Sequence, residues 1–191
     1  MINFILIGND KYWVDVGYGP NGPVFPVRLP DKAEAAVASN IAPSSLRLEY
    51  KMPYGCTDSS QRLWCFAIRI NDESPWQEMY AFTELEFLTT DYDVMNYHTS
   101  TRSSEWFTQK IVCSKMLTDT EGQIEGVVIV QDGLKIRKKG KTVLSNDFKH
   151  EGDRLKALEE HFGITFASYE RDGIRGLPSE IKTEGNSSSI G

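Results

Sequence analysis

Residues 11–26 read Lys11-Tyr-Trp-Val-Asp-Val-Gly-Tyr-Gly-Pro-Asn-Gly-Pro-Val-Phe-Pro26 and join two kinds of local sequence. In the first part, Tyr12, Val14 and Val16 alternate with the residues between them, and a period of two is typical of a β-strand. Glycines and prolines then dominate the sequence up to Pro26. Such a composition cannot continue a regular strand. We therefore expect a strand that ends in a shaped loop.

Asp15 places a carboxylate at the end of this strand, within an otherwise apolar run. Burial of an unpaired charge is unfavourable, so the carboxylate needs a partner. In one interpretation Asp15 caps the glycine loop by accepting hydrogen bonds from backbone N–H groups. In the other it has a catalytic role. The residue chemistry by itself leaves both interpretations open.

The segments 12–19 and 23–29 resemble the part of the arylamine N-acetyltransferases that carries the aspartate of their Cys-His-Asp triad. The resemblance implies that Asp15 is the catalytic aspartate. By the family pattern the triad histidine stands immediately before Met1, and the cysteine lies further upstream. The chain thus looks like a fungal-type member that lacks the N-terminal part with the catalytic cysteine and histidine.

The composition limits the class of protein. The chain has 191 residues, 40% of them hydrophobic and 11% aromatic, which is typical of a folded domain with a core. A net charge of −6 argues against a general nucleic-acid binder. No apolar run reaches the roughly 20 residues of a membrane helix, and the N-terminus lacks a signal-peptide pattern. We expect a cytoplasmic protein without nucleic-acid or membrane partners.

The cysteines Cys56, Cys65 and Cys113 do not have the spacing of a metal site, so we expect no metal. A disulfide between Cys56 and Cys65 is geometrically conceivable. Free thiols are favoured because the expected compartment is reducing.

The first half of the chain predicts antiparallel strands. Segments 2–7 and 12–16 form a hairpin, and segments 46–54, 63–70 and 77–82 follow with short turns between them. Short connections favour an antiparallel meander, which closes into a small barrel or curved sheet. Between these groups, the alanine-rich residues 32–38 form either a short helix or a loop.

A helix is predicted from Thr83, where Thr83-Glu-Leu-Glu86 has the spacing of a capping box. Phe82, Leu85, Leu88, Tyr92 and Met95 then recur at helical steps and predict a buried stripe. A polar loop rich in Ser and Thr follows at 99–107.

This loop also resembles the acetyltransferases, in which the corresponding segment contacts coenzyme A. The resemblance implies that Ser104 is the best candidate for coenzyme A binding, and His98 is a second. The chemistry is reasonable because hydroxyl groups bind phosphate and pantetheine through hydrogen bonds. The alternative is a solvated loop with local turns.

Segments 110–117, 125–131, 134–138 and 141–144 predict a second antiparallel meander, followed by a helix at 146–162 that ends before Gly163. Positive charge is concentrated on the hairpin that joins the third and fourth strands of this meander, at Lys135, Arg137, Lys138, Lys139 and Lys141. They either steer coenzyme A by charge or are solvated residues that protect a sheet edge.

The fold class expected is α+β, with an antiparallel β-barrel or meander followed by an α/β lid. It resembles the second and third domains of arylamine N-acetyltransferases, in the cysteine-protease-like superfamily. The expected domains are residues 1–82, the β-barrel portion with the Asp15 loop, and residues 83–170, the helix and sheet of the lid. Residues 171–191 are expected to be a disordered tail.

The resemblance implies acyl transfer from acetyl-CoA to arylamines or arylhydrazines, a xenobiotic-metabolising activity. A cysteine thiolate takes the acyl group from the coenzyme A thioester, and the amine then attacks the new thioester. Aromatic loop residues such as Tyr18 and Phe25 either line the amine pocket or pack in the core. Because only the aspartate of the triad is present, this chain is expected to be inactive alone.

Two alternatives remain. A truncated, non-catalytic paralogue or binding fragment would at most bind coenzyme A or pair with another chain. A papain-like hydrolase also uses a catalytic triad with a cysteine nucleophile, but the Ser/Thr-rich loop, which resembles a coenzyme A-binding segment, argues against this class.

Overall fold

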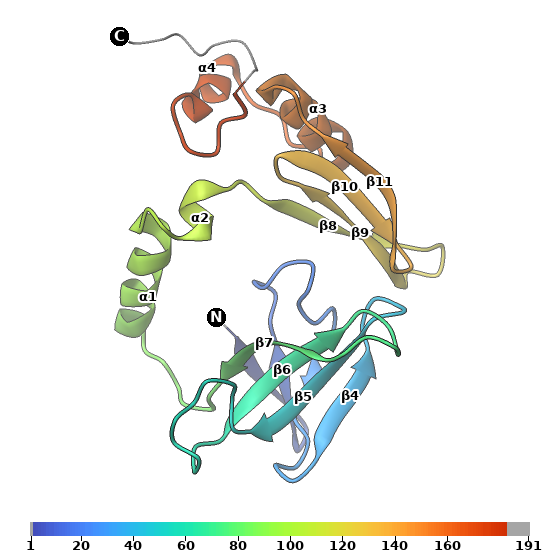
Figure 1. The fold of residues 1–191 in the computed structure, drawn as a ribbon, viewed down its shortest axis with the longest axis vertical. Helices are drawn as coiled ribbons and strands as arrows, with labels where there is room; N and C mark the ends of the chain where they lie inside the picture. The colour runs from blue at the N-terminus through green and yellow to red at the C-terminus, as the bar shows by residue number, and fades with distance from the viewer. Residues whose placement is uncertain (1, 183–191) are drawn as a thin grey trace. The chain divides into compact units, whose positions relative to one another are not determined.

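The computed structural model describes residues 2–182 and confirms the α+β class with antiparallel sheets (Figure 1). The chain divides into two compact units. The first unit comprises Met1–Leu85, Met116–Gly126 and Lys138–Lys141, and the second comprises Glu86–Lys115, Val127–Arg137 and Thr142–Gly191. Within the described residues no helix is long and apolar enough to cross a membrane.

Seven strands of the first unit form two antiparallel sheets, with the orders β1-β2-β3 and β4-β5-β6-β7. The strands are β1 (Asn3–Ile7), β2 (Asp10–Val14), β3 (Val27–Arg28), β4 (Ala35–Ser39), β5 (Ser45–Lys51), β6 (Leu63–Arg69) and β7 (Gln77–Phe82). The predicted hairpin is confirmed: Ile7 pairs with Asp10. Gly8, in the turn between them, has a φ of 62°, which glycine adopts without a steric penalty.

Strand β4 corrects the prediction for residues 32–38, which form neither a helix nor a plain loop. Ala35–Ser39 pair with β5 along their whole length. Ala36 and Ala38 are partly buried against the core of the first unit. A helix of seven residues is too short to be stable by itself, so pairing with an existing strand prevails over the helix propensity of alanine.

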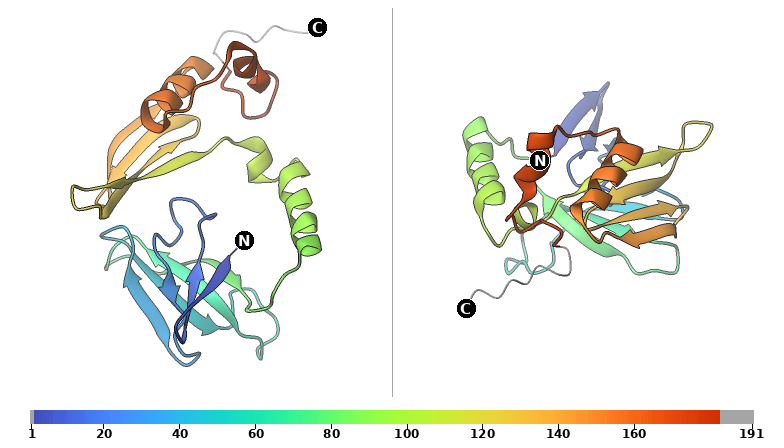
Figure 2. Two further views of the ribbon diagram at one scale, coloured as in Figure 1. Left: turned by 180° about the vertical axis from the view of Figure 1, so that it is seen from behind. Right: turned by 90° about the horizontal axis from the view of Figure 1, so that it is seen from above.

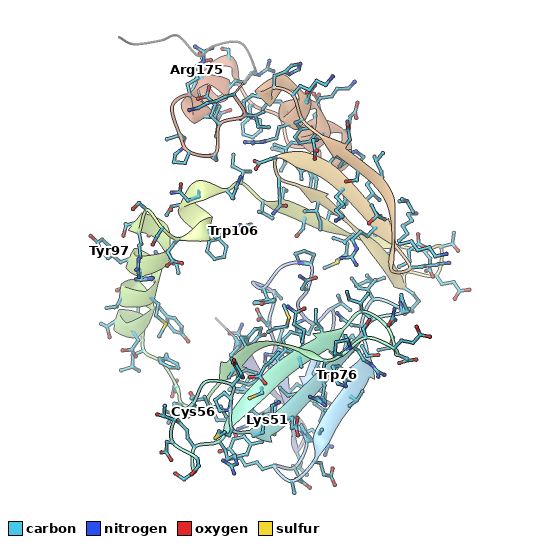
Figure 3. The ribbon with its side chains drawn as sticks, viewed as in Figure 1. Lys51, Cys56, Trp76, Tyr97, Trp106 and Arg175 are labelled. Atoms are coloured by element: carbon cyan, nitrogen blue, oxygen red, sulfur yellow. The ribbon has the colours of Figure 1, made fainter. Side chains whose placement is uncertain are left out.

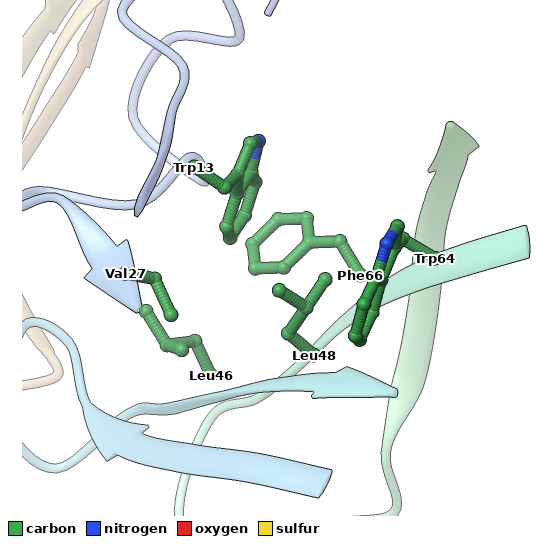
Figure 4. Close-up of a cluster of buried hydrophobic side chains, with 6 residues drawn as sticks. All are labelled: Trp13, Val27, Leu46, Leu48, Trp64 and Phe66. Carbon is green, nitrogen blue, oxygen red and sulfur yellow. The ribbon is translucent and has the colours of Figure 1, made fainter. Parts of the chain in front are cut away.

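The core of the first unit lies between its two sheets. Figure 4 shows its six buried side chains, which come from β2 and β3 on one side and from β5 and β6 on the other: Trp13, Val27, Leu46, Leu48, Trp64 and Phe66. Trp13, Leu46, Leu48 and Phe66 have no exposed surface. The rings of Trp13 and Phe66 lie 4.9 Å apart at an angle of 57°, a favourable tilted arrangement.

The predicted second meander is also confirmed. It consists of β8 (Cys113–Thr118), β9 (Ile124–Val130), β10 (Gly133–Lys138) and β11 (Lys141–Asp147), in the order β11-β10-β9-β8. Helix α3 (Glu151–Phe162) covers one face of this sheet in both views (Figures 1 and 2). Ala157 and Leu158 of α3 form a buried cluster with Val130 of β9.

Helix α3 begins later than predicted, because residues 141–147 belong to β11. Asp153 fixes its start by accepting hydrogen bonds from the backbone N–H groups of Lys149 (2.9 Å) and His150 (3.3 Å). The predicted end is confirmed at Gly163, whose φ of 69° is the left-handed conformation typical of a helix C-terminus.

Helix α1 (Thr89–Thr101) corrects the predicted start at Thr83. The hydroxyl of Thr83 accepts the N–H of Leu85 (3.3 Å) in a local turn, whereas the carboxylate of Asp91 accepts the N–H of Leu88 (2.8 Å) and starts the helix there. No residue of α1 is buried within the described part of the chain. The predicted loop 99–107 is partly helical, because α1 continues to Thr101 and α2 (Trp106–Gln109) follows.

The C-terminal segment has local structure up to Lys182. Helix α4 (Ser168–Arg171) leads into a 3-10 turn, η1 (Asp172–Ile174). The buried guanidinium of Arg154 donates two hydrogen bonds of 3.0 Å to the carbonyl of Ser179. The expected tail therefore begins as an anchored segment, and its remainder, 183–191, lies outside the described residues.

Candidate functional site

Asp15 lies directly after β2, where the strand gives way to the glycine loop. Its side chain is buried, with 7% of the residue surface exposed. One carboxylate oxygen, Oδ1, accepts the backbone N–H of Gly17 (2.9 Å), and the other, Oδ2, accepts the hydroxyl of Tyr80 in a short hydrogen bond. Asp15 therefore caps its own loop and is also held by a distant side chain.

Tyr80 reaches Asp15 from β7, where it pairs with Phe66 of the neighbouring strand. Its ring lies 5.2 Å from that of Phe66 and 4.8 Å from that of Tyr18. Burial, followed by the hydrogen bond to Asp15, raises the pKa of the Tyr80 hydroxyl well above its usual value of 10.0. Tyr80 therefore remains a neutral hydrogen-bond donor at any physiological pH.

The loop after Asp15 has a defined shape. The N–H of Gly22 donates to the carbonyl of Gly19 (3.0 Å), and the φ of 81° at Gly19 favours glycine at that position. Asn40, at the end of β4, holds the loop with two further hydrogen bonds. Its amide donates to the carbonyl of Gly22 (3.1 Å), and its oxygen accepts the N–H of Val24 (3.2 Å).

Glu84 forms a second anchored carboxylate in the first unit. It accepts a hydrogen bond from Lys11 (2.7 Å), pairs with Lys32 (3.4 Å) and accepts the indole N–H of Trp64 (3.1 Å). The hydrogen bond from Lys11, assisted by those from Trp64 and Lys32, lowers the pKa of Glu84 to about 2. This network connects Glu84, the second residue after β7, to Lys11 of β2 and Trp64 of β6.

Tyr18 and Phe25, which the sequence analysis placed in an amine pocket or in the core, are each partly exposed (38% and 37%). Tyr18 packs its ring edge against Phe66, at 6.4 Å between centroids. It therefore contributes to the aromatic surroundings of Tyr80 and still presents surface to solvent.

The two residues implied in coenzyme A binding lie at the junction of α1 and α2. His98 is on the last turn of α1, and its Nε2 lies 3.2 Å from a carboxylate oxygen of Glu105. Ser104 is exposed in the turn between the helices. Both therefore belong to one exposed segment, which continues into Trp106 of α2 (labelled in Figure 3).

The three cysteines are free. Burial raises the pKa of Cys65 to about 11 and also raises that of Cys113. Within residues 2–182 no hydrogen bond joins a cysteine to a histidine, and no cluster of three or more His, Cys, Asp or Glu side chains is suited to hold a metal. A raised pKa disfavours the reactive thiolate, so Cys65 and Cys113 are poor nucleophiles.

Sequence reasoning missed the roles of Tyr80 and Asn40. Tyr80 stands 65 residues from Asp15, and Asn40 stands 18 residues from Gly22. Tertiary packing brings each of them to its partner, because Tyr80 lies on the other sheet from Asp15 and Asn40 bonds a loop that is distant in sequence. No local pattern marks them. The only available signal was the placement of Tyr80 in a predicted strand.

The arrangement around Asp15 can orient a further hydrogen-bond donor. An ionised carboxylate has about four lone-pair positions, and two bonds to Asp15 occur within the described residues. A buried, doubly anchored carboxylate is the kind of group that fixes the tautomer and orientation of an imidazole in a nucleophilic triad.

The sequence of this chain is similar to those of known acyltransferases. A sequence model of the N-acetyltransferase family matches residues 1–171. An N-malonyltransferase of Fusarium pseudograminearum is 31% identical over 185 residues, which cover 91% of this chain and 53% of that protein. One from Gibberella moniliformis is 30% identical over 183 residues, covering 91% and 52%. The chain thus spans about half the length of the curated relatives it matches.

Solved structures of arylamine N-acetyltransferases have the same fold. The enzyme from Mycobacterium abscessus matches with a TM-score of 0.71 at 18% identity, over 89% of this chain and 55% of that one. The Mycobacterium marinum enzyme in complex with CoA matches with a TM-score of 0.66 at 20% identity, over 85% and 53%. The resemblance from which the fold was expected is confirmed.

Proposed function

The chain belongs to the N-acetyltransferase family, and we propose that it provides the aspartate of a Cys-His-Asp centre for N-acyl transfer. The acyl donor is a coenzyme A thioester and the acceptor is an arylamine or arylhydrazine. Asp15 is the aspartate. The cysteine nucleophile and the histidine come from outside the described residues, so that this chain alone is inactive.

The observation that carries the proposal is the double anchoring of Asp15. Gly17 and Tyr80 each occupy one carboxylate oxygen, and the residue is almost fully buried. A carboxylate that served only as a loop cap would need the Gly17 bond alone. The Tyr80 bond fixes the plane of the carboxylate, and this helps the group to hold an imidazole in one orientation.

Malonyl-CoA is the second candidate donor beside acetyl-CoA. Both curated relatives described above are called N-malonyltransferases, and each is about 30% identical to this chain. The Asp15 arrangement serves either donor, because it acts on the histidine and not on the acyl group. The preferred donor is therefore determined by measuring acyl transfer from acetyl-CoA and from malonyl-CoA in parallel.

Ser104 and His98 are proposed contacts for coenzyme A, and Tyr18 and Phe25 for the amine. Ser104 is exposed, so its hydroxyl can donate to a phosphate or pantetheine oxygen. Tyr18 offers an aromatic surface next to the Tyr80–Asp15 pair. An aromatic amine would stack on such a ring.

The test compares two proteins in an acyl-transfer assay with acetyl-CoA and malonyl-CoA as donors and an arylamine as acceptor. The first is the 191-residue chain. The second carries the N-terminal part of the Fusarium N-malonyltransferase fused before Met1. We expect no turnover from the first and turnover from the second.

Asp15→Asn in the fused protein should reduce kcat by about 10³- to 10⁴-fold, because the amide can favour the wrong imidazole tautomer and no longer stabilises the imidazolium by charge. Turnover by the 191-residue chain alone, whether or not Asp15→Asn abolishes it, would refute its inactivity. A fused enzyme in which Asp15→Asn has no effect would refute the proposal.

A further inference from the structure

Asn40 holds the middle of the loop 16–26 from a distant point in the chain. Its side-chain amide donates to the carbonyl of Gly22 (3.1 Å), and its side-chain oxygen accepts the N–H of Val24 (3.2 Å). An amide carries its donor and its acceptor on separate atoms, so one asparagine can satisfy two backbone groups at once. Gly22 is buried and Val24 is half-buried, so the two bonds fix the part of the loop that is shielded from solvent.

Asn40 stands on a rigid support. It directly follows β4, which pairs with β5 along its whole length. The backbone N–H of Asn40 donates to the carbonyl of Ser44 (2.9 Å), and the N–H of Ser44 donates to the carbonyl of Ile41 (2.9 Å). A side chain on a paired strand and a closed turn holds its partner more precisely than a side chain on a second loop would. Asn40 therefore ties the position of the loop to that of the sheet.

The loop carries two partly exposed aromatic rings, and different groups hold them. Tyr18, near the start of the loop, lies 4.8 Å from the ring of Tyr80 on β7. Phe25, near its end, directly follows Val24, the residue whose N–H is bonded to Asn40. With 37% of its surface exposed, Phe25 is accessible to a ligand. The position of Phe25 therefore depends on Asn40, and that of Tyr18 on ring packing.

We propose that Asn40 is a positioning residue that sets the preference for the amine, because it fixes Val24 and thereby holds the ring of Phe25 where an aromatic amine can pack on it. This inference rests on the proposed function, which assigns Tyr18 and Phe25 to the amine. The two hydrogen bonds described for Asp15 come from other residues, so Asn40 acts on substrate choice and not on the orientation of the histidine. A ring that is fixed before the ligand arrives binds it with a smaller loss of conformational entropy.

The test separates the two half-reactions of acyl transfer in the fused enzyme. When the acyl group passes through a cysteine thioester, kcat/KM for the thioester donor reports acylation of the cysteine, and kcat/KM for the amine reports attack by the amine. Asn40→Ala should lower kcat/KM for 2-aminofluorene about tenfold through the loss of one ordered aromatic contact. Aniline, which has a single ring, should lose about threefold. The value for the thioester should change by less than about twofold.

Double variants test whether Asn40 acts through the ring of Phe25. Phe25→Ala removes that ring, so adding Asn40→Ala to it should lower kcat/KM for 2-aminofluorene by less than about twofold further. Tyr18→Ala removes the ring that other groups hold, so its effect and that of Asn40→Ala should multiply.

Asn71→Ala is the matched control. Asn71 lies in the turn after β6, and its side-chain oxygen accepts the N–H groups of Glu73 (3.1 Å) and Ser74 (2.9 Å). The variant thus removes side-chain bonds to the backbone from another turn of the first unit. It should change kcat/KM for the amine and for the thioester by less than about twofold, because surface turns remote from a site affect stability and not binding.

Hydrogen exchange at the N–H of Val24 tests the Asn40 bond in the 191-residue chain without turnover. Asn40→Ala should accelerate this exchange about tenfold, the effect of one hydrogen bond lost. Asn40→Asp keeps the acceptor for Val24 and loses the donor to Gly22. It should therefore keep Val24 protected and lower kcat/KM for 2-aminofluorene by less than about threefold.

Three results would overturn the inference. They are unchanged exchange at Val24 in Asn40→Ala, equal losses of kcat/KM for the thioester and the amine, and effects of Asn40→Ala and Phe25→Ala that multiply. A fused enzyme without any turnover would refute the proposed function and this inference with it. A fused enzyme that transfers acyl groups, with amine kinetics insensitive to Asn40→Ala, would refute this inference alone.

Discussion

The Asp15 region and the α1–α2 segment carry the two groups of predicted site residues, and they differ in how firmly the fold holds them. Asp15 is buried, bonded through both carboxylate oxygens and surrounded by packed aromatic rings. His98 and Ser104 are exposed on a segment whose helix α1 buries no residue within the described part of the chain. An anchored carboxylate suits a role that depends on orientation. An exposed segment suits contact with a ligand that arrives from solution.

The largest contrast should come from truncating one aromatic ring in each region. Phe66 has no exposed surface and contacts the rings of Trp13, Tyr18 and Tyr80, whereas Tyr97 on α1 is 72% exposed. Phe66→Ala should lower the free energy of unfolding by about 3–5 kcal/mol through cavity formation. Tyr97→Ala, the matched control, should cost less than about 0.5 kcal/mol. Urea denaturation measures both, and equal losses would contradict the contrast.

The next effect is at the Tyr80–Asp15 hydrogen bond. Tyr80→Phe keeps the ring but leaves a buried carboxylate oxygen without this donor, which should cost about 1–3 kcal/mol. Tyr80 has a raised pKa in the folded state, so its contribution is complete below the usual value of 10.0 and declines as the pH rises above it.

The difference between wild type and Tyr80→Phe should therefore be constant from about pH 7 to about pH 9 and shrink above about pH 10. Denaturation at several pH values measures it. A difference that grows with pH would mean that Tyr80 does not donate to Asp15 in the folded protein.

Glu84 gives a smaller effect with the opposite pH dependence. Its pKa is lowered from 4.5 to about 2, so the stability that it contributes is present above about pH 4.5 and is lost as the pH falls toward 2. Its lysine partners are partly exposed, and we expect Glu84→Gln to cost about 1 kcal/mol at neutral pH. The cost should decline below about pH 4.5 and be largely lost at about pH 2, as measured by denaturation there. An unchanged cost there would exclude the ion pairs as its source.

The smallest stability effect is expected at the α1–α2 junction. His98→Ala and Ser104→Ala should each change the free energy of unfolding by less than about 0.5 kcal/mol, because both side chains are exposed. If they contact coenzyme A as proposed, they should raise the KM for the donor in the fused enzyme and leave kcat nearly unchanged. Loss of stability without a change in KM would show a structural role.

How much the sequence predicts depends on the range of the interactions. Local patterns predict the strands other than β3 and β4, the hairpin at Gly8 and the end of α3 at Gly163, and the structure agrees. Strand β4 was missed because its pairing with β5 overrides the helix propensity of its alanines. The start of α1 was misplaced because Thr83 and Asp91 offer competing local hydrogen bonds.

The candidate site was predictable only where local sequence determines it. Asp15 could be found from the strand and loop in which it stands. Tyr80 could not, because it lies on the other sheet of the first unit and reaches Asp15 only through the packing of the two sheets.

The most direct test of the central claim compares two carboxylates of the first unit in the fused enzyme. Asp15→Asn and Glu84→Gln each replace an anchored carboxylate by its amide, and kcat is measured for both with saturating thioester and amine. If Asp15 orients the histidine, Asp15→Asn should lower kcat by at least about 10³-fold, and Glu84→Gln by less than about threefold. Equal effects, or a kcat that Asp15→Asn leaves unchanged, would contradict the account.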